Sequence, residues 1–273
     1  MIAGFHGVSR PKPTVKRTPL VLPLLLAAAL QLACASDSSI GAPSAPPAPG
    51  AEPTATPEPT ATPTPTPEPV VRVMPLGDSI TQADSRHNSY RRPLWQKLQA
   101  DDAAVDLIGS RTGHQGGSAP AGDFDQDHEG HWGWRVDQIL RSLRGWLQAQ
   151  RPDILLVHLG TNDVLQGQGT DSTLDELEQV IDLARDVNPD FVVLLAEIIP
   201  TSDGGVTAQI RTLNAGIRDL AARRTSAASP VRAVDQFTGF DPDRQTYDGI
   251  HPNASGEEQL AVRWHTALGE FLR

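Results

Sequence analysis

From residue 70 onward, short apolar runs alternate with longer segments in which apolar side chains recur every three or four residues. The apolar runs, which predict strands, are 70–77, 105–109, 154–160, 191–198 and 231–234. The periodic segments, which predict amphipathic helices, are 90–100, 135–150, 174–187, 207–224 and 254–272. Strands that are almost continuously apolar indicate a parallel sheet with helices on both faces. The pattern therefore predicts an α/β fold, a three-layer α/β/α sandwich around a five-stranded parallel sheet.

The first 35 residues differ from this pattern and predict an export signal. Residues 1–18 carry four basic side chains and no acidic one, and residues 19–33 form an apolar run of 15. Such a run is shorter than the roughly 20 residues that a membrane-spanning helix needs. A basic start followed by a short apolar run and small residues is typical of export. We expect either a lipoprotein anchored at the cell surface through Cys34 or a freely secreted protein.

Residues 36–69 predict a Pro/Thr-rich linker. Eleven of the 24 prolines lie in this segment, which offers too few apolar side chains for a core. Proline at this density prevents regular helices and sheet pairing, and it favours an extended spacer. The remaining residues, 70–273, are then one globular domain that the linker holds away from a surface.

Charge and cysteine content exclude several kinds of function. The chain has 23 Lys and Arg against 33 Asp and Glu, a net charge of −10, which argues against nucleic acid as a partner. The one cysteine, Cys34, precedes the globular domain. A disulfide framework, a thiolate zinc site and a cysteine nucleophile are therefore not expected in residues 70–273. We expect a monomer.

Three loops at predicted strand ends carry side chains suited to acyl transfer. Ser79 follows the first strand, Asn162 follows the third, and Asp248 and His251 precede the last helix. Sites in open α/β sheets form at the carboxyl ends of strands. Alone, Ser79 also fits a helix cap and Asn162 an Asx turn. Together they predict a nucleophile, an oxyanion donor, a base and the carboxylate that orients the base.

The motifs in these loops resemble those of a known family. GDSIT (77–81), GTND (160–163) and DGIHPN (248–253) resemble blocks I, III and V of the SGNH, or GDSL-like, hydrolases. The resemblance covers residues 70–273 and implies a flavodoxin-like sandwich. It implies Ser79 as nucleophile, His251 as base and Asp248 as its orienting carboxylate. The oxyanion hole would then consist of the side-chain amide of Asn162 and the N–H groups of Ser79 and Gly133.

A narrower resemblance points to the substrate. MPLGDSIT, then Tyr90-Arg91, then HEGHWGW (128–134) resemble carbohydrate esterase family 3, the acetyl xylan esterases. Those esterases commonly have Ser where this chain has Trp132. Gly130 is a neighbouring alternative to Gly133 in the same block.

We therefore expect an exported serine esterase that deacetylates polysaccharide through an acetyl-enzyme, without a cofactor. Its partners would be acetylated polysaccharide or small esters, with membrane contact only through a lipid on Cys34. One alternative is a lipid-directed esterase or lysophospholipase. Another is a non-catalytic carbohydrate-binding module on a tether.

Three further side chains are candidates for substrate binding. Trp132 and Trp134 flank Gly133, where an indole could stack on a sugar ring or pack in the core. Arg91 lies at the start of a predicted helix, where it could pair with a carboxylate near the site or lie on the helix surface.

No metal site is expected. His128 and His131 are three residues apart, whereas HExxH zinc sites need four. The residues 123–127 alternate Asp as in a calcium loop, but the glycine and the bidentate Glu of an EF-hand are absent. His158, inside an apolar strand, predicts a hydrogen-bonded core histidine.

Overall fold

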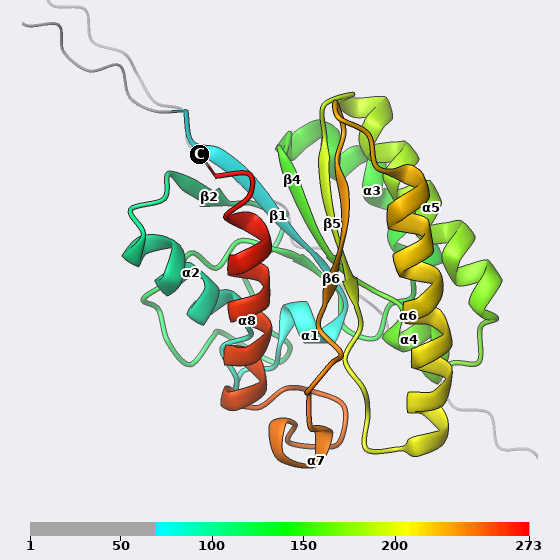
Figure 1. Ribbon diagram of the computed structural model, residues 1–273. Helices are drawn as coiled ribbons and strands as arrows, with labels where there is room; N and C mark the ends of the chain where they lie inside the picture. Colours follow the sequence, from blue (N-terminus) through cyan, green and yellow to red (C-terminus); the bar gives the residue numbers. More distant parts are fainter. Residues whose placement is uncertain (1–68, 273) are drawn as a thin grey trace, which may run out of the picture. The chain divides into compact units, whose positions relative to one another are not determined.

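The computed structural model describes residues 69–272 (Figure 1). The predicted export signal, Cys34 and the predicted linker up to residue 68 lie outside these residues. Within 69–272, none of the helices combines the length and the apolar character that a membrane crossing requires.

Helices and strands alternate along the chain. The strands are β1 Val71–Gly77, β2 Val105–Leu107, β3 Glu129–Gly130, β4 Ile154–His158, β5 Val192–Glu197 and β6 Val231–Asp235. The helices are α1 Ser79–Gln82, α2 Arg91–Ala100, α3 Val136–Gln150, α4 Thr161–Leu165, α5 Thr170–Val187, α6 Gly204–Arg224, α7 Pro242–Gln245 and α8 Ala254–Leu268. Each of the five predicted strands and five predicted long helices is present, with ends that differ by a few residues.

The sheet is parallel and has the order β2-β1-β4-β5-β6. In the part of the chain that the structure describes it has six strands rather than the predicted five, because the two-residue β3 also pairs with β1. The pairing joins Leu76 to Glu129 and Gly77 to Gly130. Two residues are too few to produce an apolar run, so the sequence pattern gave no sign of this strand.

Two apolar clusters, one on each face of the sheet, confirm the three-layer sandwich. In the central strand β4, Leu155 and Val157 belong to the cluster under α3, α5 and α6. Ile154 and Leu156 belong to the cluster under α2 and α8. Figure 1 shows these two groups of helices on opposite sides of the sheet. Because both faces of β4 are buried, the four residues before its terminal His158 are all apolar.

The loops that carry the candidate residues meet at the carboxyl edge of the sheet, where Figure 1 shows α1, α4 and α7. A Cβ atom on Gly77 would lie 2.1 Å from the Thr81 hydroxyl oxygen and 2.8 Å from the His158 carbonyl, so only glycine fits this turn into α1. Gly160, at a φ of +118°, makes the corresponding turn from β4 into α4.

Candidate active site

The structure brings Ser79, His251 and Asp248 into one chain of hydrogen bonds. His251 Nε2 lies 2.9 Å from Ser79 Oγ, and His251 Nδ1 lies 2.7 Å from Asp248 Oδ2. Asp248 Oδ1 also accepts the backbone N–H groups of His251 and Ile250, at 2.8 and 3.1 Å. The imidazole therefore lies between a hydroxyl and a carboxylate in one tightly hydrogen-bonded turn.

Ser79 is the first residue of α1, but it does not cap that helix. The cap is Asp78, whose Oδ1 accepts the N–H of Ile80 at 2.9 Å. The Ser79 hydroxyl is consequently free to face His251, and the side chain is 6% exposed. Asp78, and not Ser79, therefore caps this helix, which excludes the helix-cap interpretation of Ser79.

The turn that carries Asp248 and His251 is held from both sides. The Gly249 N–H donates to Thr246 Oγ1 at 2.8 Å, and the Gly249 carbonyl accepts the N–H of Ser202 at 2.8 Å. Gly249 has a φ of +87°, which favours glycine. Burial raises the pKa of Asp248, but the hydrogen bonds from the His251 backbone and ring outweigh it, so this pKa lies below its ordinary value. Asp248 is therefore ionised at neutral pH.

The predicted oxyanion donors also lie beside this chain of hydrogen bonds. Asn162 Nδ2 donates to Asp78 Oδ2 at 3.2 Å, which ties the amide to the residue before Ser79. Within residues 69–272, neither the Ser79 N–H nor the Gly133 N–H has a hydrogen-bond acceptor. The Gly130 N–H, by contrast, donates to His128 Nδ1 at 2.9 Å. Of the two glycines in this block, only Gly133 has a free donor.

Three buried carboxyl groups surround the site. Burial raises the pKa of Asp78 to about 7, against the hydrogen bond from Ile80. Burial likewise raises the pKa of Asp163 to about 6 and that of Glu257 to about 7. Glu257 Oε1 accepts the N–H of Ser89 at 2.9 Å, and the residue lines a small pocket with Ser79 and His251.

The raised pKa of Glu257 predicts a pH-dependent stability. The folded state holds this proton more tightly than the unfolded state, so unfolding releases it and stability falls as pH rises from about 4.5 through about 7. Glu257→Gln keeps an acceptor for Ser89 but cannot ionise. We expect its Tm to lie within about 3 °C of the wild-type value at pH 5 and to exceed it by about 6 °C or more at pH 8. A pKa raised from 4.5 to about 7 corresponds to about 3 kcal/mol, and 1 kcal/mol is worth about 2–4 °C in a domain of this size.

The control for this effect is Glu258→Gln, on the adjacent and exposed residue of α8. Thermal unfolding of the three proteins at both pH values measures the difference directly. A Glu257→Gln variant whose Tm tracks the wild type at both pH values would contradict the assignment.

The candidate substrate residues have different surroundings. Trp132 is half-buried, and its ring stacks on that of His251 with centroids 4.8 Å apart. Trp134 instead stacks on His131 at 4.4 Å and packs against the core under α3. The prediction for Arg91 is wrong. Its guanidinium is fully buried and donates to the carbonyls of Thr81, Gln82 and Gln126, so it supports backbone and reaches no solvent.

The two histidines of the HEGHWGW segment (128–134) make hydrogen bonds within the fold. His131 Nε2 donates to Glu129 Oε1 at 2.7 Å, and His128 is engaged by the Gly130 N–H and the Gly113 carbonyl. His158 is fully buried, but neither ring nitrogen has a partner within residues 69–272, so the expected hydrogen bond is not there.

The acidic loop at 123–127 does not gather its carboxylates. Asp123 pairs with Arg92 at 2.6 Å, whereas Asp125 Oδ2 accepts the N–H of Leu107 at 3.0 Å. Within the described part of the chain, no three His, Cys, Asp or Glu side chains converge as a metal site would require.

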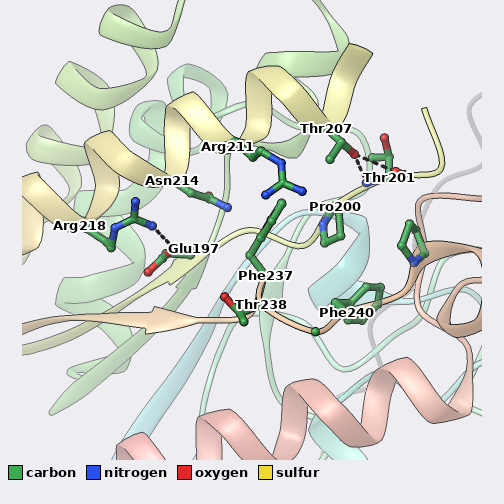
Figure 2. Close-up of a pocket in the computed structure, with 12 residues that line it drawn as sticks. Glu197, Pro200, Thr201, Thr207, Arg211, Asn214, Arg218, Phe237, Thr238 and Phe240 are labelled. Carbon is green, nitrogen blue, oxygen red and sulfur yellow. Dashed lines mark hydrogen bonds and ion pairs between the residues drawn. The ribbon is translucent and has the colours of Figure 1, made fainter. Parts of the chain in front are cut away.

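A separate cleft of about 510 Å³ lies at the ends of β5 and β6 (Figure 2). The guanidinium of Arg211 lies 4.6 Å from the ring centroid of Phe237, and Arg218 pairs with Glu197. Pro200 and Thr201 line this cleft, and the next residue, Ser202, contacts Gly249. The wall of the cleft therefore supports the turn that carries Asp248 and His251.

Sequence reasoning missed several neighbours of His251. Tyr247 and His87 line the small pocket beside Ser79, and the Tyr247 ring stacks on that of His251 at 5.6 Å. Gln82 Oε1 accepts the backbone N–H of Trp132 at 2.8 Å. None of these residues belongs to the motifs GDSIT, GTND or DGIHPN, so the sequence pattern did not single them out.

Residues 76–259 match the GDSL-like Lipase/Acylhydrolase family. The chain therefore belongs to this family, the SGNH hydrolases, and it is a carboxylic ester hydrolase. That membership decides against the alternative of a non-catalytic module.

Solved structures narrow the likeness further. The crystal structure of an acetyl esterase mutant with an acetate ion is 33% identical, covering 74% of this chain and 98% of that one, with a TM-score of 0.67. A family 3 carbohydrate esterase from Talaromyces cellulolyticus is also 33% identical, with the same coverage of 74% and 98% and the same TM-score of 0.67. A multidomain esterase of Ruminococcus flavefaciens is 27% identical over 227 residues, which cover 74% of this chain but only 29% of that protein. The chain is thus an SGNH-type esterase similar to family 3 acetyl esterases.

Proposed function

We propose that this protein is an exported serine esterase that removes acetyl groups from polysaccharide through Ser79, His251 and Asp248. The observation that carries the proposal is the continuous hydrogen-bonded chain of 2.9 Å and 2.7 Å through the His251 ring. We infer export from the basic start and apolar run within residues 1–35, and Cys34 is the residue that would carry a lipid anchor.

The chain of hydrogen bonds defines the direction of proton transfer. The ionised Asp248 accepts from Nδ1–H, which leaves the lone pair of Nε2 facing the Ser79 hydroxyl. Ser79 Oγ attacks the ester carbonyl while Nε2 takes its proton, and the imidazolium then protonates the leaving sugar oxygen. Water, deprotonated by His251, releases acetate from the acetyl-enzyme.

The negative charge of the tetrahedral intermediate needs preorganised donors. We assign this role to the N–H groups of Ser79 and Gly133 and to the amide of Asn162. Support comes from the free N–H groups of Ser79 and Gly133 and from the bond that fixes Asn162 on Asp78. Donors that are already oriented stabilise the oxyanion without reorganisation.

An acetyl rather than a long acyl group is favoured by the loop that leads to Gly133. Residues 110–134 contain no Leu, Ile, Val or Met. Of their apolar side chains, Phe124 is buried and Trp134 packs against the core. A long chain needs an aliphatic groove worth about 0.8 kcal/mol per buried methylene, and this loop supplies none. The names of the similar solved structures, an acetyl esterase and family 3 carbohydrate esterases, agree with this choice.

We expect kcat/KM on p-nitrophenyl esters to fall steeply from acetyl to butyryl and to be negligible at octanoyl. Acetate release from a panel of acetylated polysaccharides tests the sugar substrate in parallel. A kcat/KM that rises with chain length would refute the acetylesterase assignment and favour the lipid-directed alternative, with Ser79 and His251 keeping their roles.

A further inference from the structure

His251 is the second ring in a column of four. The rings of Trp132 and His251 have centroids 4.8 Å apart and planes inclined by 18°. The Tyr247 ring also stacks on His251, with centroids 5.6 Å apart and planes inclined by 14°, and His87 lies 4.0 Å from Tyr247 at 6°. Two aromatic rings therefore stack on the imidazole.

The column restricts motions that the hydrogen bonds of His251 leave free. Bonds to Asp248 and Ser79 fix the two ring nitrogens within the plane of the imidazole. They oppose tilting out of that plane only weakly, because hydrogen bonds tolerate broad out-of-plane angles. Aromatic rings stacked on the imidazole oppose this tilt directly. Nε2 can then stay aligned with Ser79 Oγ throughout the reaction.

Hydrogen bonds hold the residues that carry the rings of the column. The backbone N–H of Trp132 donates to Gln82 Oε1 at 2.8 Å, which ties the backbone of residue 132 to the helix that begins with Ser79. The backbone N–H of Tyr247 donates to the His251 carbonyl at 3.0 Å. His87 Nδ1 donates to Asp84 Oδ1 at 2.8 Å and closes the far end. The column therefore joins three loops that are distant in sequence.

The column also suits the charge that His251 gains in the reaction. Aromatic faces carry negative potential and attract a cation above them, so Trp132 and Tyr247 stabilise the imidazolium. Burial raises the pKa of Tyr247 further above its ordinary value, which keeps the phenol neutral.

We propose that Trp132 and Tyr247 are positioning residues for His251, which hold its ring and stabilise its protonated form. The proposal rests on the proposed roles of Ser79 and His251.

The test compares loss of each ring with its conservative replacement. We expect Trp132→Ser and Tyr247→Leu each to lower kcat on p-nitrophenyl acetate about ten-fold, equivalent to about 1.4 kcal/mol, with KM changed less than about two-fold. Trp132→Phe and Tyr247→Phe keep a ring, and we expect both to stay within about three-fold of wild type. Trp95→Leu, which removes a ring from α2 instead, is the control and should leave kcat unchanged.

A spectroscopic readout separates positioning from packing. In the wild type, we expect ring currents from Trp132 and Tyr247 to shift the Cε1–H resonance of His251 upfield. Trp132→Ser and Tyr247→Leu should each move this resonance downfield, and the Phe variants should not. Wild-type kcat in folded Ser and Leu variants would overturn the proposal, as would a rise in KM alone, which would make Trp132 a substrate contact. Full activity of Ser79→Ala would instead overturn the proposed function itself.

Discussion

Replacing Ser79 with alanine is expected to lower kcat/KM on p-nitrophenyl acetate by about 10⁴-fold or more and to leave Tm unchanged. The variant removes the atom that would form the acetyl-enzyme, and loss of a covalent nucleophile is among the costliest single changes in an enzyme. The fold should persist because the Ser79 hydroxyl is hydrogen-bonded to the His251 side chain and not to the backbone that forms the sheet or helices. Steady-state kinetics and thermal unfolding of the purified variant measure both effects.

The matched control is Ser85→Ala, which removes an exposed hydroxyl in the segment that follows α1. We expect this variant to have wild-type turnover. If Ser79→Ala kept more than about a tenth of wild-type activity while folded, another residue would have to be the nucleophile, and the assignments of His251 and Asp248 would fail with it.

The sequence predicted those parts of the fold whose signal is local and repeated. Strand β4 is apolar at its first four positions because both of its faces are buried, and α3 repeats apolar residues along one side. The short helices α1, α4 and α7 span four or five residues each, too few for a helical period to show. Strand β3 is defined by its pairing with β1, which depends on how the chain folds back.

The same distinction applies to the site. Ser79, Asn162, Asp248 and His251 follow or precede regular elements in compact motifs, so their convergence could be predicted from their places beside those elements and from the family resemblance. The aromatic cover of His251 comes from residues 87, 132 and 247, which no spacing rule connects. The burial of Arg91 could not be predicted from the sequence, because it depends on the carbonyls of Thr81 and Gln126, which are distant from it along the chain.

Replacing Asn162 with alanine is expected to lower kcat by about 10²–10³-fold, the usual cost of one oxyanion donor, with little change in KM. The selectivity for kcat follows because the amide is needed mainly where negative charge develops, after the substrate has bound. Asn162 is half-buried, and its side-chain amide donates to Asp78. Loss of this hydrogen bond should lower the free energy of unfolding slightly.

Asn162→Asp distinguishes a donor from a mere spacer. The carboxylate has nearly the same shape as the amide, but it has no N–H to donate and its negative charge would repel the oxyanion. We therefore expect Asn162→Asp to be at least as impaired in kcat as Asn162→Ala. An active Asn162→Asp enzyme would show that this position only holds the loop after β4. The oxyanion would then depend on the N–H groups of Ser79 and Gly133, which substitution of a side chain at position 162 leaves in place.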